Sequence, residues 1–69
     1  MRRRPIDSSA IASVGYELEK GELEVEFRSG NIYRYFGVPE EVYTGLLQAP
    51  SKGRYFGSVI RGQYESTRD

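Results

Sequence analysis

Two residue types that carry much of enzyme chemistry are missing from this sequence, because its 69 residues include no cysteine and no histidine. The absence of cysteine excludes disulfides and thiolate nucleophiles, and the absence of both excludes the usual zinc sites. Without histidine, no mechanism can use an imidazole as general base. No Walker-type phosphate loop is present either. We therefore expect a protein that is not an enzyme and has no catalytic residue, metal or cofactor.

Long apolar segments are missing as well, since no run approaches the roughly 20 residues of a membrane span. Met1 is followed by three arginines and then by Pro5, with no apolar stretch of the signal-peptide type. We expect a cytoplasmic protein without a membrane partner. Sixty-nine residues leave room for one small domain, and six tyrosines and three phenylalanines favour a folded chain over a disordered one. Nothing in the sequence requires a dimer, so we expect a monomer.

Neither sign of charge is in excess, because ten basic and ten acidic residues cancel, but the charges are segregated along the chain. Residues 16–27 carry five glutamates and one lysine, a net charge of −4. Residues 50–64 carry Lys52, Arg54 and Arg61 and no acid, a net charge of +3. This distribution predicts one acidic and one basic face, although two solvated faces that only maintain solubility would have the same pattern.

Three segments alternate between apolar and polar residues with the period of a strand. Residues 12–18 and 22–28 form the first two, and Lys20-Gly21 between them suits a two-residue hairpin turn. That turn would place Leu18 opposite Leu23 and pair like charges on the other face. Residues 32–36 form the third strand, Ile-Tyr-Arg-Tyr-Phe.

The register of the third strand decides what its two tyrosines do. A three-residue loop, Ser29-Gly30-Asn31, buries Tyr33 and Tyr35 and pairs Arg34 with Glu26. A two-residue turn would instead place both tyrosines on the charged face as a stacking platform for bases. We favour the buried register because a small core needs the aromatic area, and the exposed register stays an alternative.

Two helices are predicted after the third strand. The first begins at Val38-Pro39 with two acids in its first turn and ends at Pro50. Ser51 then caps a second helix. The predicted fold class is α+β, a three-stranded antiparallel meander followed by two helices packed on one face (β-β-β-α-α). Residues 8–65 form the domain, and we expect residues 1–7 to be a flexible basic tail and residues 66–69 a second tail.

The start of the second helix is the candidate anion site. Free N–H groups at a helix start attract anions, and Lys52 and Arg54 add full charges there. Arg61, two helical turns after Arg54, would extend a basic strip along a nucleic-acid backbone. A structural role for Ser51 as a cap and Gly53 as a packing point is the alternative. The full set of candidate nucleic-acid or anion-binding residues is Ser51, Lys52, Gly53, Arg54, Tyr55 and Arg61, with Tyr33 and Tyr35 as stacking candidates.

The acidic strands offer a second kind of site. Alternate carboxylates on an exposed strand have no cavity that would shift a pKa or exclude water, so we do not expect acid/base catalysis. They could instead dock a protein partner, and the candidate residues for this are Glu17, Glu24 and Glu26.

Several ordered motifs together resemble a known family. The most specific is Ala49-Pro-Ser-Lys-Gly-Arg-Tyr-Phe56, followed by Ile60-Arg61 and Tyr64. It is preceded by Val14-Gly-Tyr16, by Leu23-Glu-Val-Glu-Phe27 with Gly30, and by Tyr33-Arg-Tyr35 with Val38-Pro39 and Val42-Tyr43. Residues 8–64 thus resemble the KTSC domain, a small module of some lysyl-tRNA synthetases that is also found as a free-standing bacterial or phage protein. The chain has Gly57 where the family usually has asparagine.

The resemblance implies a nucleic-acid partner, because of the link with a tRNA ligase. We accordingly expect a non-enzymatic module that binds RNA or another nucleic acid through the basic segment around Lys52. A protein-interaction module that uses the acidic strand face is the alternative, and the net charge of zero favours it.

Overall fold

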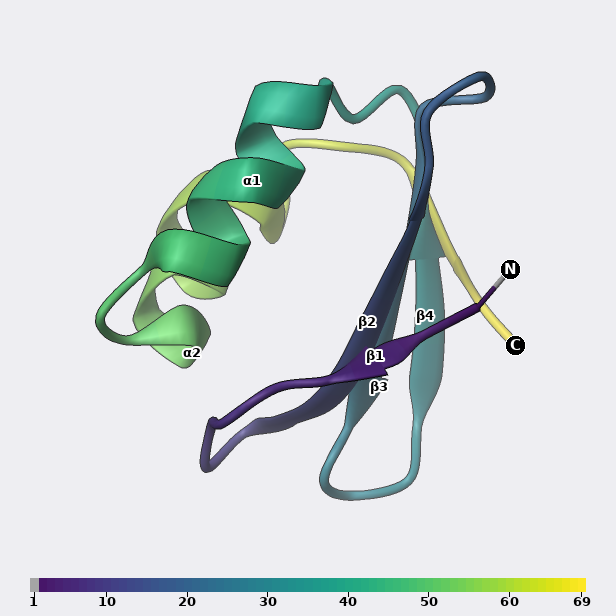
Figure 1. The fold of residues 1–69 in the computed structure, drawn as a ribbon. Helices are drawn as coiled ribbons and strands as arrows, with labels where there is room; N and C mark the ends of the chain where they lie inside the picture. The colour runs from purple at the N-terminus through teal and green to yellow at the C-terminus, as the bar shows by residue number, and fades with distance from the viewer. Residues whose placement is uncertain (1) are drawn as a thin grey trace.

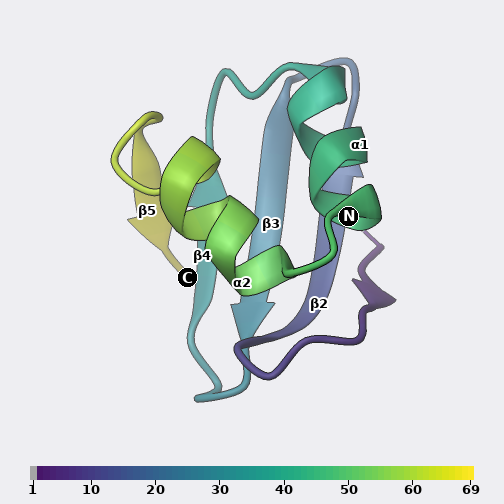
Figure 2. The ribbon, with the colours of Figure 1, turned by 90° about the vertical axis from the view of Figure 1, so that its left-hand side faces the viewer.

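The computed structural model describes residues 2–69 and contains a five-stranded antiparallel sheet in the order β1-β2-β3-β4-β5 (Figure 1). Two helical segments lie against one face of this sheet and leave the other face open (Figures 1 and 2). The α+β class and the single helical layer are therefore confirmed, while the prediction of three strands is wrong. The elements are β1 (Arg4–Pro5), β2 (Ile11–Glu17), β3 (Glu22–Phe27), β4 (Ile32–Tyr35), α1 (Glu40–Gln48), α2 (Lys52–Tyr55), the π-helical segment η1 (Phe56–Ile60) and β5 (Ser66–Arg68).

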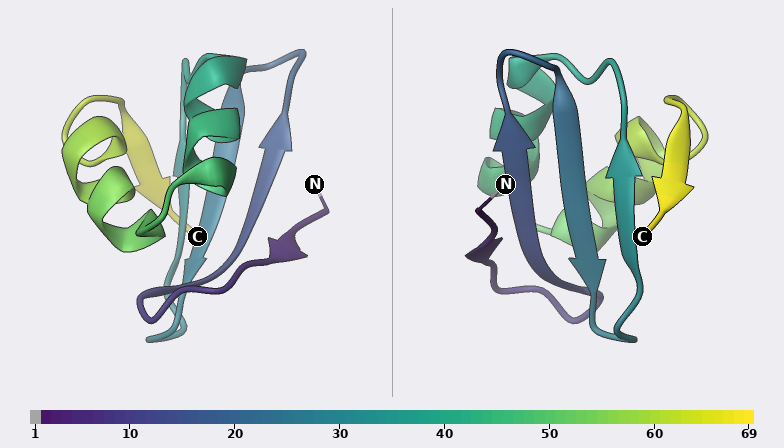
Figure 3. Two further views of the ribbon diagram at one scale, coloured as in Figure 1. Left: turned by 60° about the vertical axis from the view of Figure 1, so that its left-hand side comes forward. Right: turned by 90° about the vertical axis from the view of Figure 1, so that its right-hand side faces the viewer.

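The two additional strands are formed by the segments that we expected to be tails. In β1, Arg4 pairs with Val14 of β2, and in β5, Arg68 pairs with Tyr33 of β4. Both are edge strands, as the view of the open face shows (Figure 3). They are two and three residues long and exposed, so they carry no alternating apolar pattern that would reveal them. Backbone pairing with β2 and β4 holds them in place instead.

The core lies between the sheet and the helices, where the alternating strand residues point. Seven side chains in it are fully enclosed: Ile11, Val14, Leu23, Val25, Val38, Leu46 and Ile60. Tyr35 and Phe56 complete the buried cluster. The expectation that Tyr33 and Tyr35 face the core is thus confirmed, because Tyr35 is buried and Tyr33 packs against the core from the same face.

Both hairpins have a register that differs from the prediction by two residues. Between β2 and β3, Tyr16 pairs with Leu23, and the loop is a four-residue turn in which Leu18 is 62% exposed. The reason is that Gly21 has a positive φ of 64° whereas Lys20 does not, and a two-residue turn of type I′ requires it at both positions. The opposition of Leu18 and Leu23 is therefore wrong.

The loop between β3 and β4 does have three residues, but it begins at Arg28, one residue earlier than predicted. Phe27 and Asn31 close it with a backbone hydrogen bond of 2.9 Å. Gly30, with a φ of 100°, provides the conformation that such a loop needs at its last residue. As a result, Arg34 lies opposite Glu24 rather than Glu26.

The helices begin and end close to the predicted positions. Pro39 is the N-cap of α1 rather than its first helical residue, because its ψ of 153° is extended. Ser51 caps α2, as expected, by accepting a hydrogen bond from the Arg54 N–H at 3.4 Å. The helix then widens into η1, where the N–H of Arg61 donates to the carbonyl of Phe56 at 2.9 Å. Arg61 itself has an extended ψ of 126° and follows the helix.

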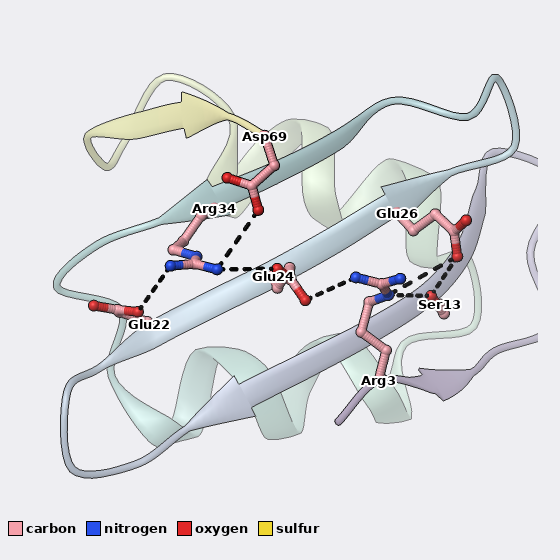
Figure 4. A network of polar contacts seen from close by, with 7 residues as sticks. All are labelled: Arg3, Ser13, Glu22, Glu24, Glu26, Arg34 and Asp69. Carbon is pink, nitrogen blue, oxygen red and sulfur yellow. Dashed lines mark hydrogen bonds and ion pairs between the residues drawn. The ribbon is translucent and has the colours of Figure 1, made fainter. Parts of the chain in front are cut away.

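An ion-pair network occupies the open face of the sheet (Figure 4). Glu24 in the middle of β3 accepts hydrogen bonds from Arg3 at 2.8 Å and from Arg34 at 3.3 Å. Asp69 at the C-terminus pairs with Arg34 at 3.5 Å. Residues near both ends of the chain are therefore tied to the central strand.

Candidate functional site

A groove of about 630 Å³ lies beside η1, at the end of the sheet where β3 turns into β4. The hairpin loop between these strands projects beyond the helices there (Figure 2), so the sheet surface next to it is not covered by α1. The groove is lined by four aromatic residues from three segments, namely Phe27, Tyr33, Tyr35 and Phe56. We call this hollow the aromatic groove.

The four rings are packed in fixed relative orientations. Phe27 makes edge contacts with Tyr33 and Phe56, with ring centroids 5.8 and 5.2 Å apart. Tyr35 also meets Phe56 edge-on at 5.5 Å, and it lies beside Tyr33 at 6.3 Å with an interplanar angle of 27°. Aromatic pairs in these orientations stabilise a fold by more than the burial of their apolar area alone. The buried rings of Tyr35 and Phe56 thus hold the half-buried rings of Phe27 and Tyr33 in place, and these two leave part of their surface to a flat ligand.

Two arginines and no acid line the groove, although the chain as a whole has no net charge. Arg28 is held by the N-terminal segment, since its Nε donates to the Ser8 carbonyl at 3.1 Å and its Nη2 to the Ile6 carbonyl at 3.4 Å. The Arg61 guanidinium carbon lies 5.9 Å from the centroid of the Phe56 ring, within cation-π range. Polar groups of Ser29 and Asn31 complete this part of the lining.

The predicted anion site at the start of α2 is partly used by the fold itself. Ser51 accepts the Arg54 N–H, and Lys52 Nζ donates to the Ala49 carbonyl at 2.9 Å. A Cβ on Gly53 would make an ordinary contact of 3.5 Å with the Ala10 side chain. Lys52 and Gly53 line a small hollow next to the aromatic groove, and Ser9 lines both.

Arg54 and Tyr55 lie elsewhere. Arg54 is exposed and lines an apolar hollow with Pro50 and Val59. Tyr55 is half-buried against α1, and its hydroxyl donates to the Val42 carbonyl at 3.1 Å. The structure thus places Arg54 and Arg61 in separate hollows, because η1 changes the helical spacing between them and Arg61 lies after the helix.

Of the acids expected to dock a protein, Glu24 is 5% exposed and both of its oxygens are bound by arginines. Burial by itself would raise the pKa of Glu24, but the hydrogen bonds from Arg3 and Arg34 outweigh it and hold that pKa below its ordinary value. Glu26 accepts a hydrogen bond from the Ser13 hydroxyl at 2.8 Å. Glu17 pairs across the hairpin with Glu22. Arg3 and Arg34 therefore neutralise Glu24 at the centre of the strand face, while the network as a whole has four acids for two arginines and Glu17 has no ion pair within residues 2–69.

Of the twelve residues that line the groove, sequence reasoning included only Tyr33, Tyr35 and Arg61 among the candidates, and the missed ones include Phe27, Arg28 and Phe56. Phe27 and Phe56 have the spacing of core residues, and in the structure they belong to the core and to the groove wall at once. The one available signal was the position of Arg28, a cation directly between a strand-ending aromatic residue and a glycine-containing loop.

Comparison with models of protein families identifies the family to which the chain belongs. The model of the KTSC domain matches residues 7–64. The chain belongs to the KTSC domain family. This confirms the resemblance carried by the Ala49–Phe56 motif. The edge strands β1 and β5 lie outside the matched residues. All residues that line the groove lie within the matched residues except Ser66.

Relatives of two kinds share this KTSC domain. An uncharacterized protein of Stutzerimonas stutzeri is 48% identical over 64 residues, which cover 93% of this chain and 90% of that protein. A lysine--tRNA ligase of Nostoc punctiforme is 41% identical over 59 residues, which cover 86% of this chain but 10% of the ligase. The domain thus matches both a protein of its own size and a small part of a much larger one.

A solved structure has the same fold. The crystal structure of a KTSC domain protein from Yersinia pestis superimposes with a TM-score of 0.94 at 40% identity, covering 99% of this chain and 96% of that one. The description of the matched family names a domain and no enzymatic reaction. Within residues 2–69, no group of acids could hold a metal ion, and neither helix has the length and apolar character to cross a membrane.

Proposed function

We propose that this KTSC domain is a non-enzymatic module that binds single-stranded RNA, with bases stacked in the aromatic groove and phosphates held by Arg28 and Arg61. The observation that carries the proposal is the groove itself, which combines the half-buried rings of Phe27 and Tyr33 with two cations and no acid. Proteins that bind single strands use this combination, because every base has a face that stacks and every phosphate a charge.

The chemistry of the groove favours a nucleotide over a purely apolar ligand. Each stacked base contributes roughly 1–3 kcal/mol in proteins of this kind, and the Tyr33 ring is half-buried, so part of it is available for stacking. Arg28 is fixed by two backbone carbonyls and keeps further N–H groups for a phosphate. No acid or imidazole lines the groove, so hydrolysis is not proposed.

RNA is proposed ahead of DNA because of the relatives. The lysine--tRNA ligases that share the domain act, by their name, on an RNA. A single strand that leaves the groove over Ser9 would pass Lys52 and Gly53, which line the adjoining hollow. The candidate site at Ser51–Arg54 is thus proposed as a flanking contact in which Lys52 takes part and Arg54 does not.

The proposal predicts salt-dependent binding of a fluorescein-labelled octauridylate, followed by fluorescence anisotropy between 25 and 200 mM KCl. Two phosphate contacts give a slope of log affinity against log salt of about −1.4. Tyr33→Leu keeps apolar volume but removes the stacking face, and we expect it to weaken binding about tenfold. Arg61→Gln is expected to weaken binding similarly and to reduce the slope by about 0.7.

Arg54→Gln is the matched control, because it removes an equally exposed cation from outside the groove. We expect it to change affinity less than twofold, with all variants checked for folding by circular dichroism. A larger loss in Arg54→Gln than in Arg61→Gln would move the phosphate site to the start of α2. Failure to bind at 25 mM KCl, where electrostatic attraction is strongest, would overturn the proposed function.

Protein docking on the acidic strand face is not proposed for this chain. Such a surface needs exposed and unpaired carboxylates, and Glu24 at its centre is buried between two arginines. A partner that replaced these contacts would have to compensate for breaking them.

A further inference from the structure

Tyr35 is the most buried of the tyrosines, and its hydroxyl has no hydrogen-bond partner within residues 2–69. It is 6% exposed and lines the groove. Two less buried tyrosines are both satisfied, since the Tyr16 hydroxyl donates to the Val38 carbonyl at 2.6 Å and that of Tyr55 to Val42 at 3.1 Å. The hydroxyls of Tyr33, Tyr43 and Tyr64 also have no partner within residues 2–69, but these three tyrosines are only half-buried. A buried tyrosine hydroxyl usually has a partner, so the hydroxyl of Tyr35, the one buried tyrosine within residues 2–69, is a group that a ligand can complete.

The hydroxyl of Tyr35 is not fully enclosed in the core, and the Tyr35 side chain lines the groove. In the described part of the chain, the only fully enclosed side-chain atom without a partner is Arg34 Nε. The ring of Tyr35 lies beside that of Tyr33, 6.3 Å away and nearly parallel. Both side chains line the groove, so a flat molecule stacked on Tyr33 would lie next to Tyr35.

The hydroxyl is protonated at neutral pH and can both donate and accept a hydrogen bond. Burial raises the pKa of Tyr35 above its ordinary value and the neighbouring Tyr33 raises it further, while Arg61 lowers it. Arg61 lies over the Phe56 ring, with its guanidinium carbon 5.9 Å from the ring centroid, and the same Phe56 ring meets the Tyr35 ring edge-on at 5.5 Å. One polar group for a base edge and one cation for its phosphate are thus present at the same end of the groove.

We propose that the groove takes one unpaired base, stacked on Tyr33, and that the Tyr35 hydroxyl hydrogen-bonds the edge of that base. This inference rests on the proposed function and adds its specificity. In a duplex, the hydrogen-bonding edges of the bases are occupied by their partners and their faces by the stack. The ligand is therefore a nucleotide outside a duplex, such as a single strand or a bulge.

The test uses one RNA hairpin in three forms, with a single bulged uridine, with an abasic site at that position, and without the bulge. Affinity for the domain is measured for each form at 50 mM KCl. We expect the bulged hairpin to bind at least tenfold more tightly than the other two. Tyr35→Phe removes only the hydroxyl, and we expect it to weaken binding of the bulged form three- to tenfold and to leave the abasic form unchanged.

Tyr43→Phe is the matched control, since Tyr43 stacks on Tyr16 at 4.9 Å and does not line the groove. It should bind all three forms like the unmodified domain. Equal losses of Tyr35→Phe on the bulged and abasic forms would overturn the inference, and so would equal affinity of the unmodified domain for all three hairpins. Both results would leave the proposed function intact as long as the domain still binds octauridylate, and so would failure to bind any hairpin, which would overturn the inference alone. Failure to bind octauridylate as well would overturn the proposed function.

Discussion

Gly45→Ala is expected to lower the free energy of unfolding by about 2 kcal/mol, although alanine is favoured over glycine by about 1 kcal/mol inside a helix. Gly45 lies in α1 where Tyr55 crosses it. A Cβ there would overlap the Tyr55 hydroxyl oxygen and come within 2.8 Å of the Cζ atom of the same ring. The hydrogen bond from this hydroxyl to the Val42 carbonyl holds the ring in place, so the overlap cannot be relieved without losing that bond.

Two further variants separate this overlap from a general effect of alanine. Gly57→Ala, in η1, places its Cβ where no atom lies within 4 Å, so we expect it to be neutral or to stabilise the fold. In a Tyr55→Leu background, Gly45→Ala should lower the free energy of unfolding much less, because the ring that the new Cβ would overlap is absent. Urea unfolding followed by circular dichroism measures all of these. A Gly45→Ala variant as stable as the unmodified domain would contradict the close packing of α1 against α2.

The alternating pattern was sufficient to predict three strands and their faces, because a period of two depends only on which residues are apolar. It could not fix the hairpin registers. Those depend on the conformation of single residues such as Lys20 and Arg28, and a shift of two residues preserves the faces. The apolar pattern of Leu23, Val25 and Phe27 is therefore compatible with both the predicted and the observed pairing.

The edge strands were not predictable for a different reason. Arg4–Pro5 and Ser66–Arg68 carry no alternating apolar pattern, and the strands that pair with them are distant in the sequence or unknown until the sheet is formed. Arg3 reaches Glu24 across β2, where Gly15 has no side chain in the way. A charged N-terminal residue of this kind cannot be distinguished from a tail until the sheet is known.

The candidate site was only partly accessible from sequence. Lys52 and Arg61 were identified because cations are visible as residues, and Tyr33 and Tyr35 because they are aromatic. The aromatic groove itself depends on Phe27 and Phe56 meeting at 5.2 Å across 29 positions of the chain. Each had a sufficient explanation as a core residue, so no local pattern could show that the edge of the core is also the wall of a groove.

Glu24→Gln is expected to have the other large effect, a loss of about 2–3 kcal/mol in the free energy of unfolding at pH 7. Hydrogen bonds to charged groups contribute about 1.5–3 kcal/mol, and the carboxylate receives them from Arg3 and Arg34 (Figure 4). The amide keeps the shape but removes the charge. Glu19→Gln is the matched control, because Glu19 is exposed in the turn after β2 and has no ion pair within residues 2–69.

The stability difference between the unmodified domain and Glu24→Gln is expected to depend on pH. The folded protein holds the pKa of Glu24 below its ordinary value of 4.5, so the unfolded chain takes up a proton first as the pH falls. The stability that the carboxylate contributes is therefore fully present above the unfolded pKa and is lost as the pH falls through the folded one. The difference between the unmodified domain and Glu24→Gln should accordingly shrink as the pH falls below about 4.5. A difference that stayed constant from pH 7 to pH 3 would mean that Glu24→Gln acts through packing and that the ion pairs with Arg3 and Arg34 contribute nothing to the fold.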